Sequence, residues 1–184
     1  MDSTHVTDPT TPHTKQTDIS IITLNIRGLN TTNSLEKKLP KIKLLIDKKQ
    51  PDFLLLQETN ITKKEIENEI IEYLGAKTSI FNNKATGSGN AILQFSDGWK
   101  IIGHDFKEQG RKTVVEVTKN NKKYNLINIY APSDAKERKI MFTKLNKEIS
   151  KLNDKIILAG DYNVTLDDRD IVGLNVHKNP PGRI

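Results

Sequence analysis

The chain has 184 residues, of which 35% are hydrophobic and 28% are charged, and it contains no cysteine. This size and composition are typical of one globular domain with a sizeable core, and the lack of cysteine excludes disulfides, iron–sulfur centres and cysteine-based zinc sites. The formal net charge of +6 suits a polyanionic partner, although lysines spread over helix faces also serve solubility alone.

Two features at the level of the whole chain bear on location. The longest apolar runs are far too short to span a membrane, so we expect no membrane association. Residues 1–17 are rich in threonine and proline and carry no apolar stretch, so we predict a disordered tail and no signal peptide. A single domain is predicted over residues 18–184, and the protein is expected to be intracellular.

Strands and helices alternate in the first part of the chain. Strands, both buried, are predicted over residues 19–26 and 52–57, and helices over residues 34–49 and 62–74. Pro40 indicates that the first helix starts or kinks there. Thr62 and Glu65 form a capping-box pattern at the start of the second helix, and Gly75 ends it.

The middle of the chain is richer in short strands. They are predicted near residues 78–81, 90–95, 99–106, 113–118 and 124–130. Clusters of glycine, asparagine and aspartate between them indicate antiparallel meanders, with a hairpin turn at residues 120–121. Asp134 then caps a helix with four residues facing inward, Ile140, Leu145, Ile149 and Leu152. A last buried strand covers residues 155–159 and ends at Gly160.

Polar side chains follow several of these strands, in the segments at residues 24–29, 56–59, 128–133 and 159–163. Because each segment comes after an apolar strand, their polar groups are expected to meet at one edge of a sheet. Each segment also has an ordinary structural explanation. Asn25 suits a strand-ending amide, Glu58 an exposed loop carboxylate and Tyr130 a half-buried core aromatic, while residues 161–163 suit a simple turn.

Taken together and in order, the strings LNIRGLN, LLLQET, INIYAPS and LAGDYNVTLDDRD resemble the endonuclease/exonuclease/phosphatase superfamily of metal-dependent phosphodiesterases. They are most similar to the apurinic-like endonuclease domain of non-LTR retrotransposons, and residues 165–169 favour that branch. The resemblance runs over residues 19–173. It implies an α/β (α+β) fold, a four-layer α/β/β/α sandwich of the deoxyribonuclease-like type.

The resemblance also implies roles for five residues. Glu58 would be the ligand of Mg²⁺, or alternatively Mn²⁺, with Asn25 as a supporting contact to the metal or its waters. Asp161 would align or activate the attacking water, Asn163 would hydrogen-bond the phosphate, and Tyr130 would face it. Phosphodiester hydrolysis needs a hard cation, and Mg²⁺ prefers few carboxylates and several waters. The residue types suit a metal–phosphate site, but their spacing does not assign the roles.

Basic side chains are candidates for contacts to DNA phosphates. Arg27 and Arg138 are predicted to bind substrate in this way, with Arg111 and the lysines at positions 136, 139 and 144 as further candidates. A solvated helix face is the alternative explanation for the lysines. The Gly-Ser-Gly-Asn sequence at residues 87–90 is interpreted as a tight turn, because no helix follows it to form a phosphate loop.

One family segment is missing. Members of the superfamily end with further strands and a Ser-Asp-His segment, whose histidine pairs with an aspartate as catalytic base or charge stabiliser. The residues after Asp161 contain no such segment, and His177 has no adjacent acidic partner. We therefore expect a domain that is incomplete at its C-terminus and lacks its last strands. The missing strands would leave apolar surface exposed, and each Å² left unburied forgoes about 25 cal/mol of stabilisation. We therefore expect the chain to be marginally stable and prone to aggregation.

These observations predict a Mg²⁺-dependent endonuclease that nicks DNA as the target-site endonuclease of a retroelement polyprotein. DNA is the expected partner, a downstream reverse transcriptase in the same polyprotein is a further one, and a DNA substrate implies access to the nucleus. Two alternatives stay open. One is a phosphatase or small-diester phosphodiesterase of the same superfamily, and the other is an incomplete fragment that only binds polyanions through its lysines.

Overall fold

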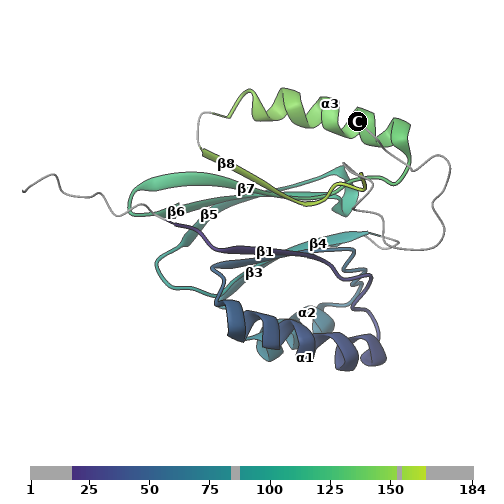
Figure 1. Ribbon diagram of the computed structural model, residues 1–184, viewed down its shortest axis with the longest axis vertical. Coiled ribbons are helices and arrows are strands. Elements are labelled where there is room, and N and C mark those ends of the chain that lie inside the picture. Colours follow the sequence, from purple (N-terminus) through teal and green to yellow (C-terminus); the bar gives the residue numbers. More distant parts are fainter. Residues whose placement is uncertain (1–17, 84–87, 153–154, 165–184) are drawn as a thin grey trace, which may run out of the picture.

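The computed structural model describes residues 18–83, 88–152 and 155–164. Two four-stranded sheets pack face to face, and helices cover both outer faces, so that the layers run α/β/β/α (Figure 1). This arrangement confirms the predicted four-layer sandwich. None of the helices in these parts of the chain is long and apolar enough to cross a membrane.

The first sheet has the strand order β1-β2-β4-β3. Its strands are β1 (Ile21–Asn25), β2 (Phe53–Gln57), β3 (Thr78–Asn83) and β4 (Gly89–Gln94). β1 and β2 are parallel, whereas β4 runs antiparallel to both of its neighbours. β2 is buried along its whole length, as predicted. The predicted two-sided burial of the first strand is wrong, because β1 is the edge strand among the described residues and Thr23 is exposed.

Helices α1 (Thr32–Lys49) and α2 (Lys64–Leu74) cover the outer face of this sheet. α1 begins with a capping box between Thr31 and Ser34 and continues through Pro40. The capping box predicted for α2 is wrong, since the helix starts at Lys64 and its N-cap makes no side-chain cap bond to described residues. Instead, the helix is stabilised by two glutamates in its first turn, whose negative charges interact with the positive end of the helix dipole. Gly75 ends α2 with φ 75°, as predicted.

The second sheet has the strand order β5-β6-β7-β8. Its strands are β5 (Lys100–Lys107), β6 (Lys112–Lys119), β7 (Lys122–Tyr130) and β8 (Lys155–Asp161), and a short 3₁₀ helix η1 (Glu108–Gly110) joins β5 to β6. β5, β6 and β7 form the predicted antiparallel meander, with both asparagines of the hairpin turn at positive φ. β8 returns parallel to β7 after α3 (Ala135–Ile149).

Helix α3 covers the second sheet, and its inward face differs from the prediction. Asp134 caps the helix as expected, accepting from the backbone N–H groups of residues 136 and 137. Ile140, however, is 56% exposed, whereas Arg138, Met141 and Leu145 are buried. The guanidinium of Arg138 donates to the carbonyl oxygens of residues 132 and 133. The predicted phosphate contact of Arg138 is therefore wrong, because a side chain that is 4% exposed holds the β7–α3 connection.

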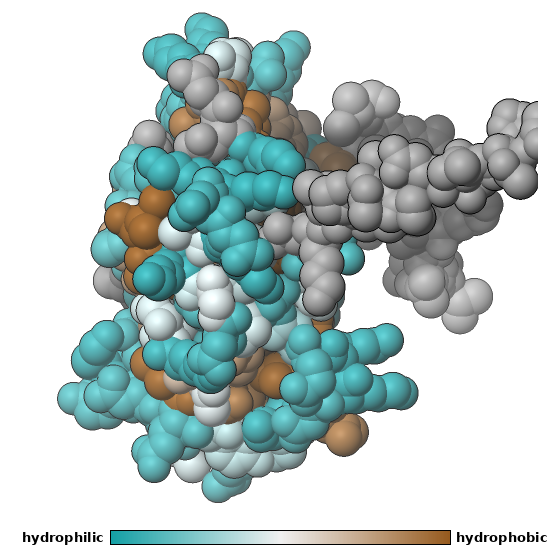
Figure 2. Space-filling model, turned by 90° about the vertical axis from the view of Figure 1, so that its left-hand side faces the viewer, coloured by the Kyte–Doolittle hydropathy of each residue, from teal (hydrophilic) through white to brown (hydrophobic). Residues whose placement is uncertain are grey.

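Strand register sets the position of the polar segments. The parallel pairs place Asn25 level with Gln57 and Tyr130 level with Asp161. β1 also contacts β8 across the interface between the sheets. The carboxyl ends of β1, β2, β7 and β8 consequently lie at one end of the sandwich, the right-hand end of Figure 1. The opposite end, which faces the viewer in Figure 2, is mostly hydrophilic with small hydrophobic patches.

Candidate active site

The side chain of Asn25 joins two carboxylates at this end of the sandwich. Its Nδ2 atom donates to Glu58 Oε1 at 2.7 Å and to Asp161 Oδ2 at 2.6 Å. The Oδ1 atom accepts from the backbone N–H of Arg27 at 3.1 Å, which fixes the orientation of the amide. One amide therefore holds together carboxylates that come from different sheets.

The backbone around Glu58 is held by the loop that follows β1. The N–H groups of Gly28 and Leu29 donate to the carbonyl oxygens of Glu58 and Thr59, at 2.6 and 2.8 Å. Glu58 itself has a φ of 53°, in the left-handed region that non-glycine residues seldom adopt. Strain of this kind persists only where the surrounding structure enforces it, and it clusters at functional sites. The two loops thus fix the direction of the Glu58 carboxylate.

Asp161 and Asn163 are positioned at the end of β8. Asp161 Oδ1 accepts from the backbone N–H of Asn163, and Asn163 Nδ2 donates to the carbonyl oxygen of Ala131 at 2.6 Å. Gly160 lets β8 approach β7 closely, since a Cβ atom there would lie 1.9 Å from the carbonyl oxygen of Ile129. Both oxygens of Asp161 therefore accept hydrogen bonds, and these two bonds fix the orientation of the carboxylate.

Tyr130 lies beside these groups at the end of β7. Burial raises the pKa of its hydroxyl above the ordinary value of 10.0, and hydrogen bonding to Glu58 and the charge of that carboxylate raise it further. Asp161 also raises the pKa of Tyr130, whereas Arg111 lowers it. The Arg111 guanidinium lies over the Tyr130 ring, 5.0 Å from the centroid. At neutral pH the hydroxyl is consequently a protonated donor.

The Tyr130 environment predicts an alkaline titration that can be isolated. Without divalent cations, the tyrosinate absorbance of the wild type minus that of Tyr130→Phe should report a pKa above 10.0, and Glu58→Gln should lower this pKa. Because the folded state disfavours the phenolate, the free energy of unfolding should fall as the pH rises above 10. A difference titration centred at or below 10 would contradict the described environment.

Lys38 on α1 stabilises the loop that follows Asn25 and carries Arg27. Its ammonium donates to the carbonyl oxygens of Ile26, Arg27 and Gly28, at 2.7, 2.8 and 2.8 Å. An ammonium has three protons, and the three loop carbonyl oxygens accept all of them, so Lys38 has no donor left. Sequence analysis did not single out Lys38, because one lysine among many on a helix carries no local signal.

Replacing Lys38 by methionine should loosen this loop without unfolding the domain. We expect faster hydrogen exchange at the Gly28 and Leu29 amides and a loss of any catalytic activity at this site of up to about 10²-fold, since small misplacements of reacting groups are costly. Lys38→Arg should recover part of the loss. Lys41→Met, at an exposed position of the same helix, is the control. Unchanged exchange and activity in Lys38→Met would show that the loop holds its shape without the ammonium.

A network of buried amides lies beneath the site, between the two sheets. Asn128 Nδ2 donates to the carbonyl oxygens of Leu56 and Ala91, and its Oδ1 accepts from Gln57 Nε2 at 2.7 Å. Asn90 Nδ2 donates to the carbonyl oxygen of Asn128. Gln57 and Asn128 lie in the polar segments of the sequence, and Asn90 lies in the predicted turn at residues 87–90, but the sequence assigns no site role to these amides. Polar residues inside otherwise apolar strands are the signal that would have indicated them.

The structure brings together five of the residues predicted for the site, namely Asn25, Glu58, Tyr130, Asp161 and Asn163. Arg27 lies on the adjoining loop, where its side chain is exposed. His177 and residues 165–169 lie outside the described residues. The turn predicted at residues 87–90 is wrong for its second half, because Gly89 and Asn90 belong to β4 and pair with Asn83 and Asn82 of β3.

The donor set fits a hard cation with few protein ligands. In the described part of the chain, no group of three or more histidine, cysteine, aspartate or glutamate side chains gathers. Glu58 and Asp161 provide two carboxylates around one amide, and Mg²⁺ is commonly bound by one or two carboxylates together with waters. The Nδ2 atom of Asn25, and not its Oδ1 atom, faces the two carboxylates, so ligation by Asn25 of a cation between them would require its amide to turn. A bound Mg²⁺ would neutralise charge on a reacting phosphate.

Comparison with known proteins decides the family. Residues 22–181 match the sequence model of the endonuclease/exonuclease/phosphatase family. The chain belongs to this family. Endonuclease/exonuclease/phosphatase proteins are hydrolases that generally use divalent metals. A curated relative, the Transposon TX1 uncharacterized 149 kDa protein of Xenopus laevis, is 30% identical over 119 residues, which is 62% of this chain and 9% of that protein.

Solved structures share the fold of this endonuclease/exonuclease/phosphatase domain. TDP2 from Caenorhabditis elegans matches with a TM-score of 0.60 and 21% identity, over 86% of this chain and 50% of that chain. D. rerio TDP2 complexed with a single strand DNA product matches with a TM-score of 0.65 and 20% identity, over 80% and 61%. The endonuclease/exonuclease/phosphatase from Bacteroides vulgatus matches with a TM-score of 0.65 and 16% identity, over 82% of this chain and 67% of that chain. The chain thus spans about half to two thirds of these proteins.

Proposed function

We propose that this chain is a Mg²⁺-dependent phosphodiesterase that nicks DNA, with Mn²⁺ as an alternative cation, and that it is the target-site endonuclease of a retroelement polyprotein. The observation that carries the proposal is the cluster in which Asn25 joins the Glu58 and Asp161 carboxylates beside Tyr130. Two carboxylates, an amide and a protonated phenol are groups that can hold a cation, orient a water and donate to a phosphate in metal-assisted hydrolysis of a phosphodiester.

Each group has a chemical task in this proposal. Glu58 holds the cation, and Asp161, whose orientation is defined by Asn25 and Asn163, orients the attacking water and accepts its proton. The Tyr130 hydroxyl donates to a phosphate oxygen. Asn163 has two amide protons, of which Ala131 accepts one, so the other is suited to the same phosphate. Arg27, on the adjoining loop, is proposed to contact a neighbouring phosphate of the strand.

DNA is the proposed substrate for three reasons. The net charge of +6 favours a polyanion. A fold relative, D. rerio TDP2, was solved with a single strand DNA product. The Xenopus laevis relative is a transposon protein, which supports a role in retroelement insertion and a reverse transcriptase in the same polyprotein.

Nicking of supercoiled plasmid by the full chain tests the proposal. With Mg²⁺ or Mn²⁺ we expect conversion to the open circle, and with EDTA or with Glu58→Ala we expect none. The rate at subsaturating DNA should fall as salt rises, because phosphate contacts release counterions. Hydrolysis of small phosphate esters without affinity for duplex DNA would favour the phosphatase alternative. Polyanion binding without turnover, unchanged in Glu58→Ala, would overturn the enzymatic proposal.

A further inference from the structure

The outer face formed by α1 and α2 carries opposite charges on its two helices. Figure 1 shows these helices side by side beneath the first sheet, with no labelled element on their outer side. The exposed residues of α1 on this face include three lysines, and those of α2 include three glutamates, namely Lys37, Lys41, Lys48, Glu65, Glu69 and Glu72. None of these six side chains makes an ion pair or hydrogen bond with a described residue.

The six residues form one charged stripe on each helix. Residues three, four and seven positions apart share a helix face, and the lysines and glutamates have these spacings. The residues that each helix buries, among them Leu39 and Ile46 in α1 and Ile70 in α2, lie on the opposite side, so both stripes point away from the sheet. Asp47 does not cancel the lysine stripe, because it pairs with Lys43 on the flank of α1 at 3.0 Å.

Two large apolar side chains accompany the stripes. Leu44, between the lysines of α1, is 70% exposed, and Tyr73, beside the last glutamate of α2, is 47% exposed. Leu44 is the most exposed large hydrophobic residue in the described part of the chain. Exposed apolar side chains that are rimmed by polar residues mark surfaces that bind other molecules.

The positions of the two stripes along the helices are matched. β1, β2 and β3 run in the same direction, so α1 and α2, which return between them, are parallel to each other. Lys43 Nζ donates to the carbonyl oxygen of Leu74 at 3.4 Å, which places Lys43 level with the end of α2. Two residues earlier on both helices, Lys41 is level with Glu72. Leu44 likewise lies within one turn of the level of Tyr73, by the same count.

We propose that two copies of this chain associate through this face, with α1 of each copy packed on α2 of the other. A two-fold axis parallel to the helices produces this arrangement, and every contact then occurs twice. It sets Lys41 opposite Glu72 of the second copy, and Leu44 beside Tyr73 of the second copy. A two-fold axis across the helices would instead set α1 on α1 and bring lysines together. Charge complementarity therefore selects the first arrangement.

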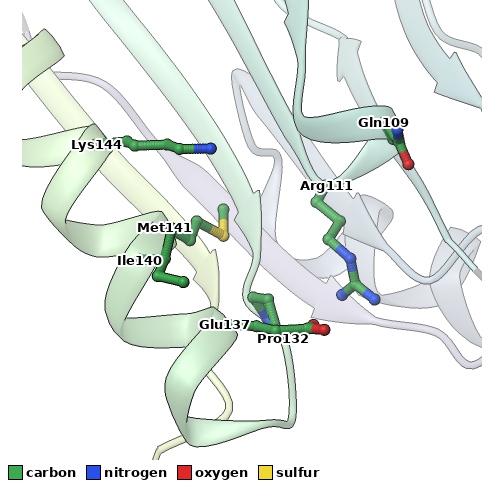
Figure 3. Close-up of a pocket in the computed structure, with 7 residues that line it drawn as sticks. All are labelled: Gln109, Arg111, Pro132, Glu137, Ile140, Met141 and Lys144. Carbon is green, nitrogen blue, oxygen red and sulfur yellow. The ribbon is translucent and has the colours of Figure 1, made fainter.

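This dimer leaves the other functional surfaces open. α1 and α2 both begin at the end of the sandwich that carries the candidate active site, so the two sites lie at the same end of the dimer and neither is covered. A pocket of about 330 Å³, lined by Gln109, Arg111 and Met141 among others, lies beside α3 on the other side of the sandwich (Figure 3). Association through α1 and α2 consequently does not depend on DNA or on a cation.

Analytical ultracentrifugation of the full chain, without DNA or divalent cations, measures this association. We expect a reversible equilibrium between monomer and dimer at protein concentrations up to about 100 µM, because exposed ion pairs contribute little each and the affinity is weak. Raising NaCl to about 1 M, where the screening length falls to about 3 Å, should weaken the dimer about tenfold.

Charge reversal tests the pairing of α1 with α2 of the second copy. Lys41→Glu and Glu72→Lys should each weaken dimerisation about tenfold or more, since each substitution brings like charges together twice. An equimolar mixture of these two variants should form heterodimers with the affinity of the wild type, because every contact between them again joins opposite charges. Lys123→Glu on β7 and Glu116→Lys on β6, at exposed positions away from both helices, are the matched controls and should dimerise normally.

A further variant tests the apolar contact. Leu44→Ser should weaken dimerisation about threefold or more, because less apolar surface is buried between the copies. Ile102→Ser, at an exposed position of β5, is its control. Melting curves followed by circular dichroism show that each variant is folded, so that a loss of dimer is not a loss of structure.

Each outcome decides the proposal without reference to nicking activity. A dimer that both single reversals break and their mixture restores supports it, even if the chain is not a nuclease. A wild type that stays monomeric at every concentration overturns it, even if the chain nicks DNA. A dimer that neither reversal weakens overturns it too, since another surface would then hold the copies together. Broken homodimers without recovery in the mixture would overturn the pairing of α1 with α2.

Discussion

Asp161→Asn is expected to lower the nicking rate by about 10²–10⁴-fold, the range typical of a lost general base. The variant keeps the shape of the side chain but removes its charge and basicity. It also places an amide NH₂ group against one of its two present donors, the Asn25 amide or the Asn163 N–H. Single-turnover nicking with saturating enzyme measures the effect on the chemical step apart from DNA binding.

Asp134→Asn is the matched control for this prediction. Asp134 is an exposed aspartate that caps α3, and asparagine caps helices about as well as aspartate does. The control should therefore change neither the melting temperature nor the nicking rate. If Asp161→Asn nicked at a rate within a few-fold of the wild type, Asp161 would have no role in proton transfer, and the proposed assignment of the base would be wrong.

Asn128→Leu is expected to lower the free energy of unfolding by about 3 kcal/mol, because three buried hydrogen bonds are lost at about 1 kcal/mol each. The lost bonds join Asn128 to Leu56, Ala91 and Gln57. Leucine has a similar volume, so the loss reflects unpaired polar groups and not a cavity. This loss is large, because the total free energy of unfolding of a native protein is typically about 5–15 kcal/mol.

Urea unfolding followed by circular dichroism measures this loss. Asn146→Leu replaces an exposed asparagine on α3 and should change the midpoint little. A midpoint for Asn128→Leu equal to that of the wild type would mean that the sheets stay together without the amide network. The contacts between β2, β4 and β7 would then owe their stability to apolar packing alone.

Several features of the site were predictable from local sequence. Glu58, Tyr130 and Asp161 each end or follow an apolar strand, and the ends of parallel strands meet at one edge of a sheet. The predicted roles of these residues rested on resemblance to a family and not on spacing. Asn25 and Asp161 are 136 residues apart, so no local pattern indicates that one amide joins Asp161 to Glu58.

Helix faces show where local patterns are insufficient. The apolar residues of α3 predict that Ile140 faces inward, yet Met141 and Leu145 are buried in the core and Ile140 is exposed. The predicted surface cation Arg138 is buried, because the β7–α3 connection presents carbonyl oxygens to it. The phase of an amphipathic helix with several apolar residues depends on the surface against which it packs.

The sequence by itself determined the order of strands and helices, the polar strand ends and the overall positive charge, because these follow from periodicity, caps and composition over short stretches. Only the tertiary structure decided which side chains meet. It brought Lys38 to three loop carbonyls, Asn128 between the sheets and Arg111 to both Tyr130 and the pocket. These contacts depend on strand register and sheet packing, which join residues that are distant along the chain.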